Sequence, residues 1–196
     1  MKSFLLHVFY LVFCFCSLLS GSAQDDQVVK RVTKIHREAL TVDSHTDTPL
    51  RLMQSGFDIS ARHDPVNDHS KLDFPRMKEG GLDAAFFGIF VSQGKRIPEA
   101  NARAKEKAWV LFDTIYSVTK RFPDLCRLAL SPSDAYRLKR KGKRAIFIGI
   151  ENGYPIGNDI DLIKFFMIKA HVISPFATQG TMISVTLPQI PWSITG

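Results

Sequence analysis

The sequence contains little cysteine, with three residues in a chain of 196. Two of them, Cys14 and Cys16, lie close to the N-terminus, so the chain after residue 23 keeps only Cys126. A single cysteine excludes an internal disulfide in that part of the chain. Because no base is evidently paired with it, we interpret Cys126 as a small packed residue rather than a nucleophile.

Long apolar runs are also lacking after residue 23, where no stretch reaches the ~20 apolar residues that a membrane span needs. The N-terminus differs, because Met1-Lys2 precedes an almost wholly apolar stretch from Leu5 to Leu19, and Gly21-Ser22-Ala23 follows. A basic start, a short apolar core and small residues are typical of a secretory signal peptide. The alternative, a membrane anchor, would need a longer run. We therefore expect residues 1–23 to be a signal peptide, and the protein to be periplasmic, secreted or on the cell surface.

Clustered positive charge is scarce, although the formal net charge is +7. The basic residues are scattered apart from Lys139–Arg144, and no aromatic side chains alternate with that run. The run lies where a helix should stop before a strand, so we interpret it as a solvated turn. This pattern argues against nucleic acid as a partner.

The apolar residues recur in patterns that predict an α/β chain with a parallel sheet. Runs of strand length alternate with helical spacing, which is typical of strands joined by covering helices. We expect a helix over Asp25–Arg37, strands over Ala39–Val42, Leu82–Val91 and Arg144–Ile150, and helices beginning at Pro98 and Pro132.

Polar side chains follow two of these strands. His45 and Asp47 come after the first strand, and Glu151 closes the last one. In parallel α/β folds, functional residues gather at the carboxyl ends of strands. On an extended strand, residues two apart point to the same face, so His45 and Asp47 can converge on one metal ion. The alternative is a strand end whose polar residues face water.

Two further histidines, His63 and His69, lie in a polar stretch between residues 58 and 76. They show no spacing typical of metal ligands, so we interpret this stretch as a surface loop.

Three segments together resemble the membrane dipeptidase family, also called renal-type dipeptidases. They are Asp43–Pro49, Asp73–Ala84 and Gly149–Gly153, and they follow one another in the family's order. The resemblance implies a (β/α)8 barrel of the TIM type that hydrolyses dipeptides with two zinc ions. It also implies metal ligands at His45 and Asp47, and at Glu151 a catalytic residue that bridges both ions. Asp43 would support the site as a hydrogen-bond acceptor.

The chain departs from that family in its second half. The two later histidines that hold the second zinc ion, and a histidine that holds the substrate, have no match. A (β/α)8 barrel needs about 250 residues. We therefore expect residues 24–166 to form the N-terminal portion of the barrel, incomplete in this chain, with impaired activity.

The last residues change in character, because no Asp or Glu follows Asp161 and Lys169 is the only Lys or Arg after position 166. When Lys164–Gly196 are back-translated with codons that the genetic code permits, one added thymine in the run for Phe165-Phe166 allows the reading KFFYDKG and then YITLCHTRNND. This second string resembles the family's next strand and substrate-histidine segment. We expect residues 167–196 to be read out of frame, through either a sequencing error or a pseudogene.

Two other interpretations stay open. One is a catalytically inactive fragment or pseudoenzyme, and the other is a different barrel-type metal-dependent amidohydrolase, against which the Asp73–Ala84 block argues. The sequence leaves membrane association and the oligomeric state open.

Overall fold

The computed structural model describes residues 26–169 and 172–175. The expected signal peptide and most of the expected out-of-frame tail lie outside these residues. The chain divides into two units, Met1–Thr41 and Val42–Gly196, and each is described by itself. In the first unit, residues 26–38 form the expected helix. Its apolar residues Val28, Val29, Val32 and Ile35 are all exposed.

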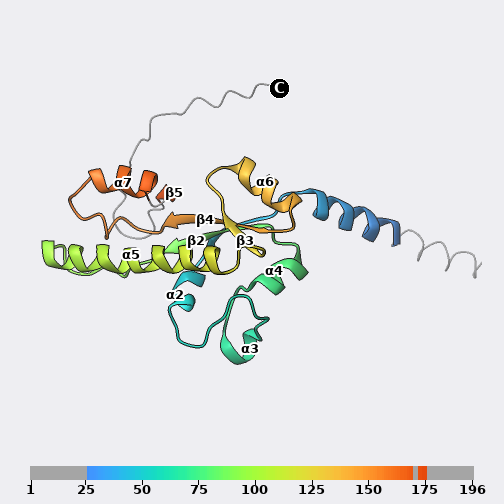
Figure 1. Ribbon diagram of the computed structural model, residues 1–196, viewed down its shortest axis with the longest axis horizontal. Coiled ribbons are helices and arrows are strands. Elements are labelled where there is room, and N and C mark those ends of the chain that lie inside the picture. Colours follow the sequence, from blue (N-terminus) through green and yellow to red (C-terminus); the bar gives the residue numbers. More distant parts are fainter. Residues whose placement is uncertain (1–25, 170–171, 176–196) are drawn as a thin grey trace, which may run out of the picture. The chain divides into compact units, whose positions relative to one another are not determined.

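The second unit is built on a parallel sheet, as the alternating pattern predicts (Figure 1). Strands β1 (Val42–Thr46), β2 (Ala84–Ile89) and β4 (Arg144–Ile150) lie side by side in that order. Strands β3 (Cys126–Leu128) and β5 (Val172–Pro175) also pair in parallel with β4. The sequence reasoning missed β3, because three residues are too few to show a periodic pattern.

Helices connect these strands and are ended by local signals. They are α2 (Thr48–Leu52), α3 (Pro65–Asp68), α4 (Phe74–Gly80), α5 (Pro98–Arg121), α6 (Pro132–Arg140) and α7 (Asp161–Lys169). Proline occupies the first turn of α5 and α6, as expected, since its missing N–H is no loss there. Gly81 ends α4 with a φ of 71°, a conformation that glycine adopts without strain. None of the helices in the described ranges is long and apolar enough to cross a membrane.

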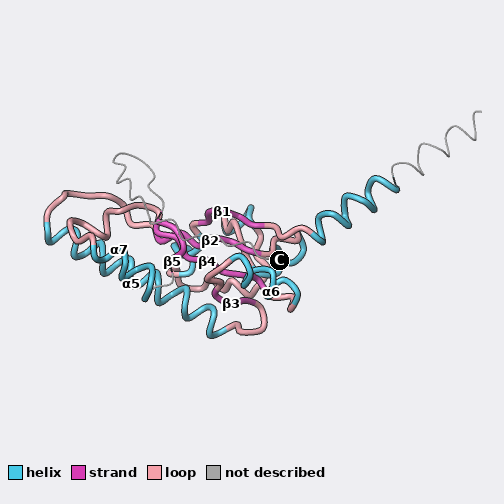
Figure 2. The backbone as a smooth tube through the Cα atoms, turned by 90° about the horizontal axis from the view of Figure 1, so that it is seen from above, coloured by secondary structure: helices cyan, strands magenta, loops and turns pink. Residues whose placement is uncertain are grey.

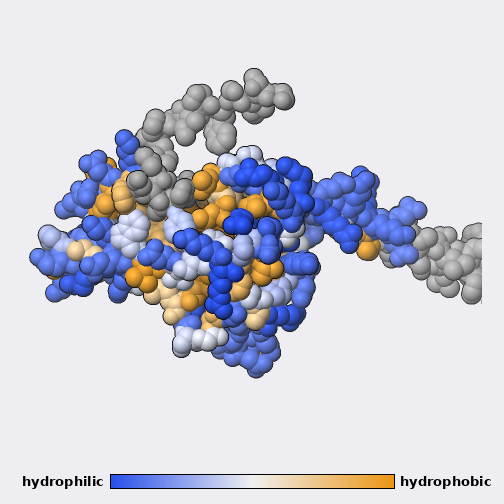
Figure 3. All heavy atoms as spheres, viewed as in Figure 1, coloured by the Kyte–Doolittle hydropathy of each residue, from blue (hydrophilic) through white to orange (hydrophobic). Residues whose placement is uncertain are grey.

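The two faces of the sheet differ. On one face, Ala85, Phe87 and Ile89 of β2 join Ile146, Ile148 and Ile150 of β4 and the buried stripe of α5 in a single core. Figures 1 and 2 show α5 running alongside the strands. On the other face, Phe86 and Phe147 stack with ring centroids 4.7 Å apart. In the space-filling view, apolar side chains gather in the middle of the visible face, over the strands (Figure 3).

The first strand lies further along the chain than expected. We predicted a strand over Ala39–Val42, but β1 begins at Val42. The reason is its partner: Val42 is opposite Ala84, where β2 itself begins, so the three residues before Val42 have no strand beside them. His45 is therefore inside the strand rather than after it.

The loop that contains His63 is ordered by that residue. The imidazole Nε2 is 2.8 Å from the Asp58 carbonyl oxygen, and Nδ1 contacts the Asp68 carboxylate. The ring stacks on Phe57, with centroids 4.4 Å apart. His63 thus closes its own loop, in agreement with its interpretation as a loop residue rather than a metal ligand.

Candidate metal centre

A bulge in β1 sets the direction of His45. Asp43 is opposite Ala85 and Thr46 is opposite Phe87, so β1 has one residue more than β2 over this interval. Bulges of this kind redirect side chains near functional sites. The Asp43 carboxylate accepts a hydrogen bond from the His45 backbone N–H at 3.0 Å, which agrees with its expected supporting role.

The His45 ring lies against Gly88 of β2. A Cβ atom at position 88 would be 2.7 Å from the His45 Cε1 atom, closer than real Cβ contacts. The ring can occupy this position only because residue 88 has no side chain. Sequence reasoning did not identify Gly88, since a glycine in an apolar strand gives no signal of what crosses over it.

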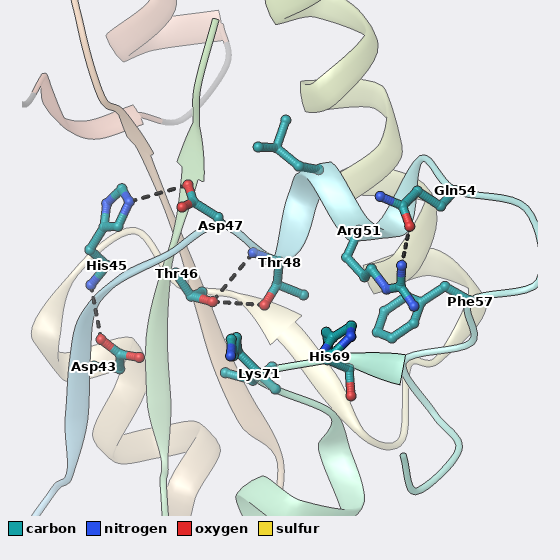
Figure 4. Close-up of a pocket in the computed structure, with 13 residues that line it drawn as sticks. Asp43, His45, Thr46, Asp47, Thr48, Arg51, Gln54, Phe57, His69 and Lys71 are labelled. Carbon is teal, nitrogen blue, oxygen red and sulfur yellow. Dashed lines mark hydrogen bonds and ion pairs between the residues drawn. The ribbon is translucent and has the colours of Figure 1, made fainter. Parts of the chain in front are cut away.

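Asp47 lies close to His45, but it is not positioned by the strand as predicted. The strand ends at Thr46, and Asp47 is the N-cap residue of α2, with φ −81° and ψ 14°. The expectation that strand alternation aligns His45 with Asp47 is therefore wrong in its cause. The two side chains nevertheless meet, with His45 Nε2 3.4 Å from Asp47 Oδ1 (Figure 4). Buried hydroxyls of Thr46 and Thr48, 2.7 Å apart, hold the turn between them.

Glu151 completes the group from the end of β4. Its backbone N–H donates to the Ile89 carbonyl oxygen at 3.2 Å, which continues the pairing of β2 and β4. Its Oε2 atom is 3.4 Å from His45 Nε2. The structure thus brings together all three side chains that the sequence proposed as ligands, and one donor atom from each lies within 4.8 Å of the others.

The donor set and its spacing fit zinc. One imidazole nitrogen and two carboxylate oxygens are common zinc ligands, and tetrahedral ligands at about 2.0–2.1 Å from zinc lie about 3.3–3.4 Å apart. Both contacts of His45 Nε2 measure 3.4 Å. Across the described residues this is the one group of three or more ligand-type side chains that could hold a metal ion, so His63 and His69 belong to no such group.

The residue after Glu151 fastens the edge of the site. Buried Asn152 donates from Nδ2 to the Val91 carbonyl oxygen at 3.1 Å, and its Oδ1 accepts from the Tyr154 N–H at 3.0 Å. The Tyr154 hydroxyl in turn donates to the Lys95 carbonyl oxygen at 2.8 Å. These bonds tie the loop after β4 to the loop after β2, which gives a structural role to the Glu151-Asn152-Gly153 segment.

We call His45, Asp47 and Glu151 the metal group. A pocket of about 440 Å³ opens beside it. His45 lines it from β1, Asp47 and Arg51 line it from the N-cap and the body of α2, and His69 and Lys71 line it from the segment that follows α3. The sequence reasoning missed Arg51 and Lys71, because their convergence depends on the path of the loop between α2 and α4.

Cys126 takes no part in the site. It is fully buried at the start of β3, and burial raises the pKa of its thiol to about 12. A protonated, inaccessible thiol is a poor nucleophile, which confirms its interpretation as a packed residue.

Two comparisons of the sequence with known proteins lead to one family. The sequence profile of the membrane dipeptidase family, peptidase family M19, matches residues 29–172. Dipeptidase ataJ of Aspergillus terreus is 24% identical over 129 residues, which are 63% of this chain and 31% of that protein.

Two solved structures share the fold. The probable dipeptidase PvdM from Pseudomonas aeruginosa matches with a TM-score of 0.66 and 24% identity, over 79% of this chain and 38% of that one. A metallo peptidase from Rhodobacter sphaeroides, liganded with a phosphinate mimic of the dipeptide L-Ala-D-Ala, matches with a TM-score of 0.51 and 20% identity, over 65% and 42%.

The chain therefore spans between about a third and two fifths of the length of these proteins. The predicted α/β class is confirmed, and the partial coverage fits the predicted incomplete barrel. The match to the family profile extends over most of the sequence, from the helix before β1 to the first residue of β5. The chain belongs to the membrane dipeptidase family.

Proposed function

We propose that this chain carries the first half of the zinc centre of an enzyme that hydrolyses dipeptides. The observation behind the proposal is the convergence of His45, Asp47 and Glu151 at the carboxyl ends of parallel strands. Membership of the membrane dipeptidase family and the dipeptide mimic held by the Rhodobacter sphaeroides structure support dipeptides as the substrate class.

The three side chains have distinct roles in this proposal. Zinc, when bound, supplies Lewis acidity that lowers the pKa of water and polarises a carbonyl group. His45 offers Nε2 while its backbone is held by Asp43. Asp47 offers a carboxylate that is 61% exposed, whereas Glu151 is 19% exposed and therefore less solvated. A half-buried carboxylate with two oxygens suits the bridging role between two ions that we propose for Glu151.

We also propose that the second ion lacks part of its ligand set in this chain. Within the described ranges, no second group of three ligand-type side chains accompanies the one around His45. Without further ligands the second ion would bind weakly, and hydrolysis would be impaired.

The two ends of the chain have separate roles in the same proposal. Residues 1–23 direct export, and residues 167–196 are read out of frame. Resequencing the gene across the codons of Phe165 and Phe166 tests the reading frame. If no alternative frame continues with a family-like sequence, the proposed frameshift is refuted.

Metal binding and hydrolysis test the function separately. Zinc titration by calorimetry should give one ion per chain, with an affinity that falls at least tenfold in His45→Ala. His36→Ala, an exposed histidine on the helix over residues 26–38, is the matched control and should bind zinc as the wild type does. Hydrolysis of L-Ala-D-Ala should be weak in this chain and strong once the frame is restored. Strong hydrolysis by the present chain that His45→Ala abolishes would refute the impairment, and absence of zinc binding would refute the site.

A further inference from the structure

The pocket beside the metal group is lined by two cationic side chains, Arg51 and Lys71, that do not belong to that group. Its volume, about 440 Å³, lies in the range of small-molecule sites. Figure 4 shows His45 and Asp47 on one side of it, and Arg51, Phe57 and His69 on the other. Arg51 and Lys71 both line the pocket, and two carboxylates, Asp43 and Asp47, face them.

Among the residues that the structure describes, no acidic partner compensates the charge of Arg51. Its guanidinium contacts the Gln54 side chain, donates to the Asp68 carbonyl oxygen at 2.8 Å, and lies 5.5 Å from the centre of the Phe57 ring. All three partners are neutral groups. Its Nε is buried and has no hydrogen-bond partner in the described structure. A guanidinium held in place by neutral groups keeps its charge available for a ligand.

Lys71 adds a second cation from a segment that is fixed in place. No carboxylate of the described residues lies within ion-pair distance of its ammonium group. The preceding residue, Ser70, is anchored, because the Arg76 guanidinium donates to its carbonyl oxygen and hydroxyl at 3.1 and 2.8 Å. His69, which also lines the pocket, has a φ of 57° and is the one non-glycine residue in the described ranges with a positive φ. Such backbone strain is typical of functional segments.

The two facing carboxylates do not cancel these cations once the metal is bound. Asp47 belongs to the metal group, where a cation neutralises it, and Asp43 accepts the hydrogen bond from the His45 backbone. Leu50, Phe57 and Leu72 supply an apolar wall. The pocket therefore combines room for methylene groups with two cations next to the metal group.

We propose that this pocket binds a side-chain carboxylate of the substrate, so that dipeptides with an aspartyl or glutamyl residue are preferred. This inference rests on the proposed function, because it takes a dipeptide as the ligand. Arg51 and Lys71 are its specificity-determining residues. The apolar wall packs against the methylene groups of the bound residue, and the two cations meet its carboxylate.

Binding measured without turnover tests the inference. The full chain, saturated with zinc, is titrated by calorimetry in the cold with L-alanyl-L-glutamate and with L-alanyl-L-glutamine, which have nearly the same shape but differ in charge. Chromatography after each titration shows that the dipeptide is still intact. We expect an affinity about tenfold higher for the glutamate dipeptide, which corresponds to about 1.4 kcal/mol. Lys71→Met and Arg51→Met should reduce this ratio to below about twofold, and Arg51→Lys should retain part of it. Lys120→Met, an exposed lysine on α5, removes the same charge outside the pocket and should leave the ratio unchanged.

The outcomes separate the inference from the proposed function. Equal affinity of the wild-type chain for the two dipeptides overturns the inference, even where zinc binds normally. An equal loss for both dipeptides in Lys71→Met also overturns it, because the pocket then reads the α-carboxylate common to both. A glutamate preference in a chain that fails to bind zinc supports the pocket and refutes the proposed metal site. Since Arg51 also anchors the loop through Asp68, Lys71→Met decides the result if Arg51→Met does not fold.

Discussion

Replacing Gly88 with alanine should weaken zinc binding although residue 88 offers no ligand atom. The added Cβ would lie 2.7 Å from His45 Cε1 and 3.3 Å from Nε2, whereas ordinary contacts begin near 3.4 Å. The imidazole must therefore move by about 0.7 Å, the difference between 2.7 and 3.4 Å. Because His45 Nε2 is the atom that lies 3.4 Å from both carboxylates, this movement changes both distances.

A shift of that size exceeds the tolerance of a preorganised site, which is about 0.5 Å. Loss of support for a metal ligand typically costs 10–100-fold in metal affinity, so we expect a reduction of about tenfold or more in Gly88→Ala. The assay is zinc competition with a chromophoric chelator, with circular dichroism to show that the sheet is retained. Gly80→Ala is the control, because a Cβ there meets nothing within 4 Å. Wild-type zinc affinity in a folded Gly88→Ala chain would refute the geometry that we assign to His45.

Three further changes probe the frame around the site. Asp73→Asn should lower the free energy of unfolding by about 2 kcal/mol, measured by urea denaturation, because this buried carboxylate accepts hydrogen bonds from Arg76 and the His63 backbone. Burial opposes ionisation of Asp73, but those bonds hold its pKa below the usual value, so its contribution should disappear as the pH falls below about 4. The hydrogen bond to the Asp58 carbonyl raises the pKa of His63 above 6.5, so the thermal stability lost in His63→Gln should be larger at pH 6 than at pH 8; an equal loss would contradict this. Asn152→Ala leaves the buried Val91 carbonyl without its donor, and should cost about 1–2 kcal/mol by the same denaturation while zinc affinity falls less than in Glu151→Gln.

The parallel sheet could be predicted because its strands carry strong local signals. β4 matches the expected Arg144–Ile150, since a buried parallel strand is apolar throughout and a charged turn precedes it. α5 and α6 begin at the prolines that predicted them. The boundary of β1 could not be predicted in this way, because strand pairing rather than local preference decides where it begins. The same reason hides β3, which is defined only by its contact with β4.

His45, Asp47 and Glu151 could be predicted as ligands from their position at strand ends. Their side chains are aligned by other features, which the sequence does not reveal. The carboxyl ends of parallel strands share one edge, so ligand-type side chains in the last residues of β1 and β4 or directly after these strands lie at the same edge. That rule needs no knowledge of the bulge in β1 or of the helix cap at Asp47, and it identified His45, Asp47 and Glu151. It cannot identify Gly88 or Arg51, whose importance depends on which side chain crosses over them or which loop returns beside them.

The structural supports of His45 argue that metal binding and catalysis are separable in this chain. Asp43 holds its backbone, Gly88 leaves room for its ring, and the pairing of β2 with β4 positions Glu151. All of these contacts are made within the described residues, so they do not require any further part of a barrel. A site for one ion can therefore form without the ligands of a second ion, which we propose this chain lacks. This arrangement predicts zinc binding without efficient hydrolysis. The measurement is zinc stoichiometry, which should depend on His45 but not on the reading frame after Phe166. A chain that cannot assemble the site would bind no zinc in either frame.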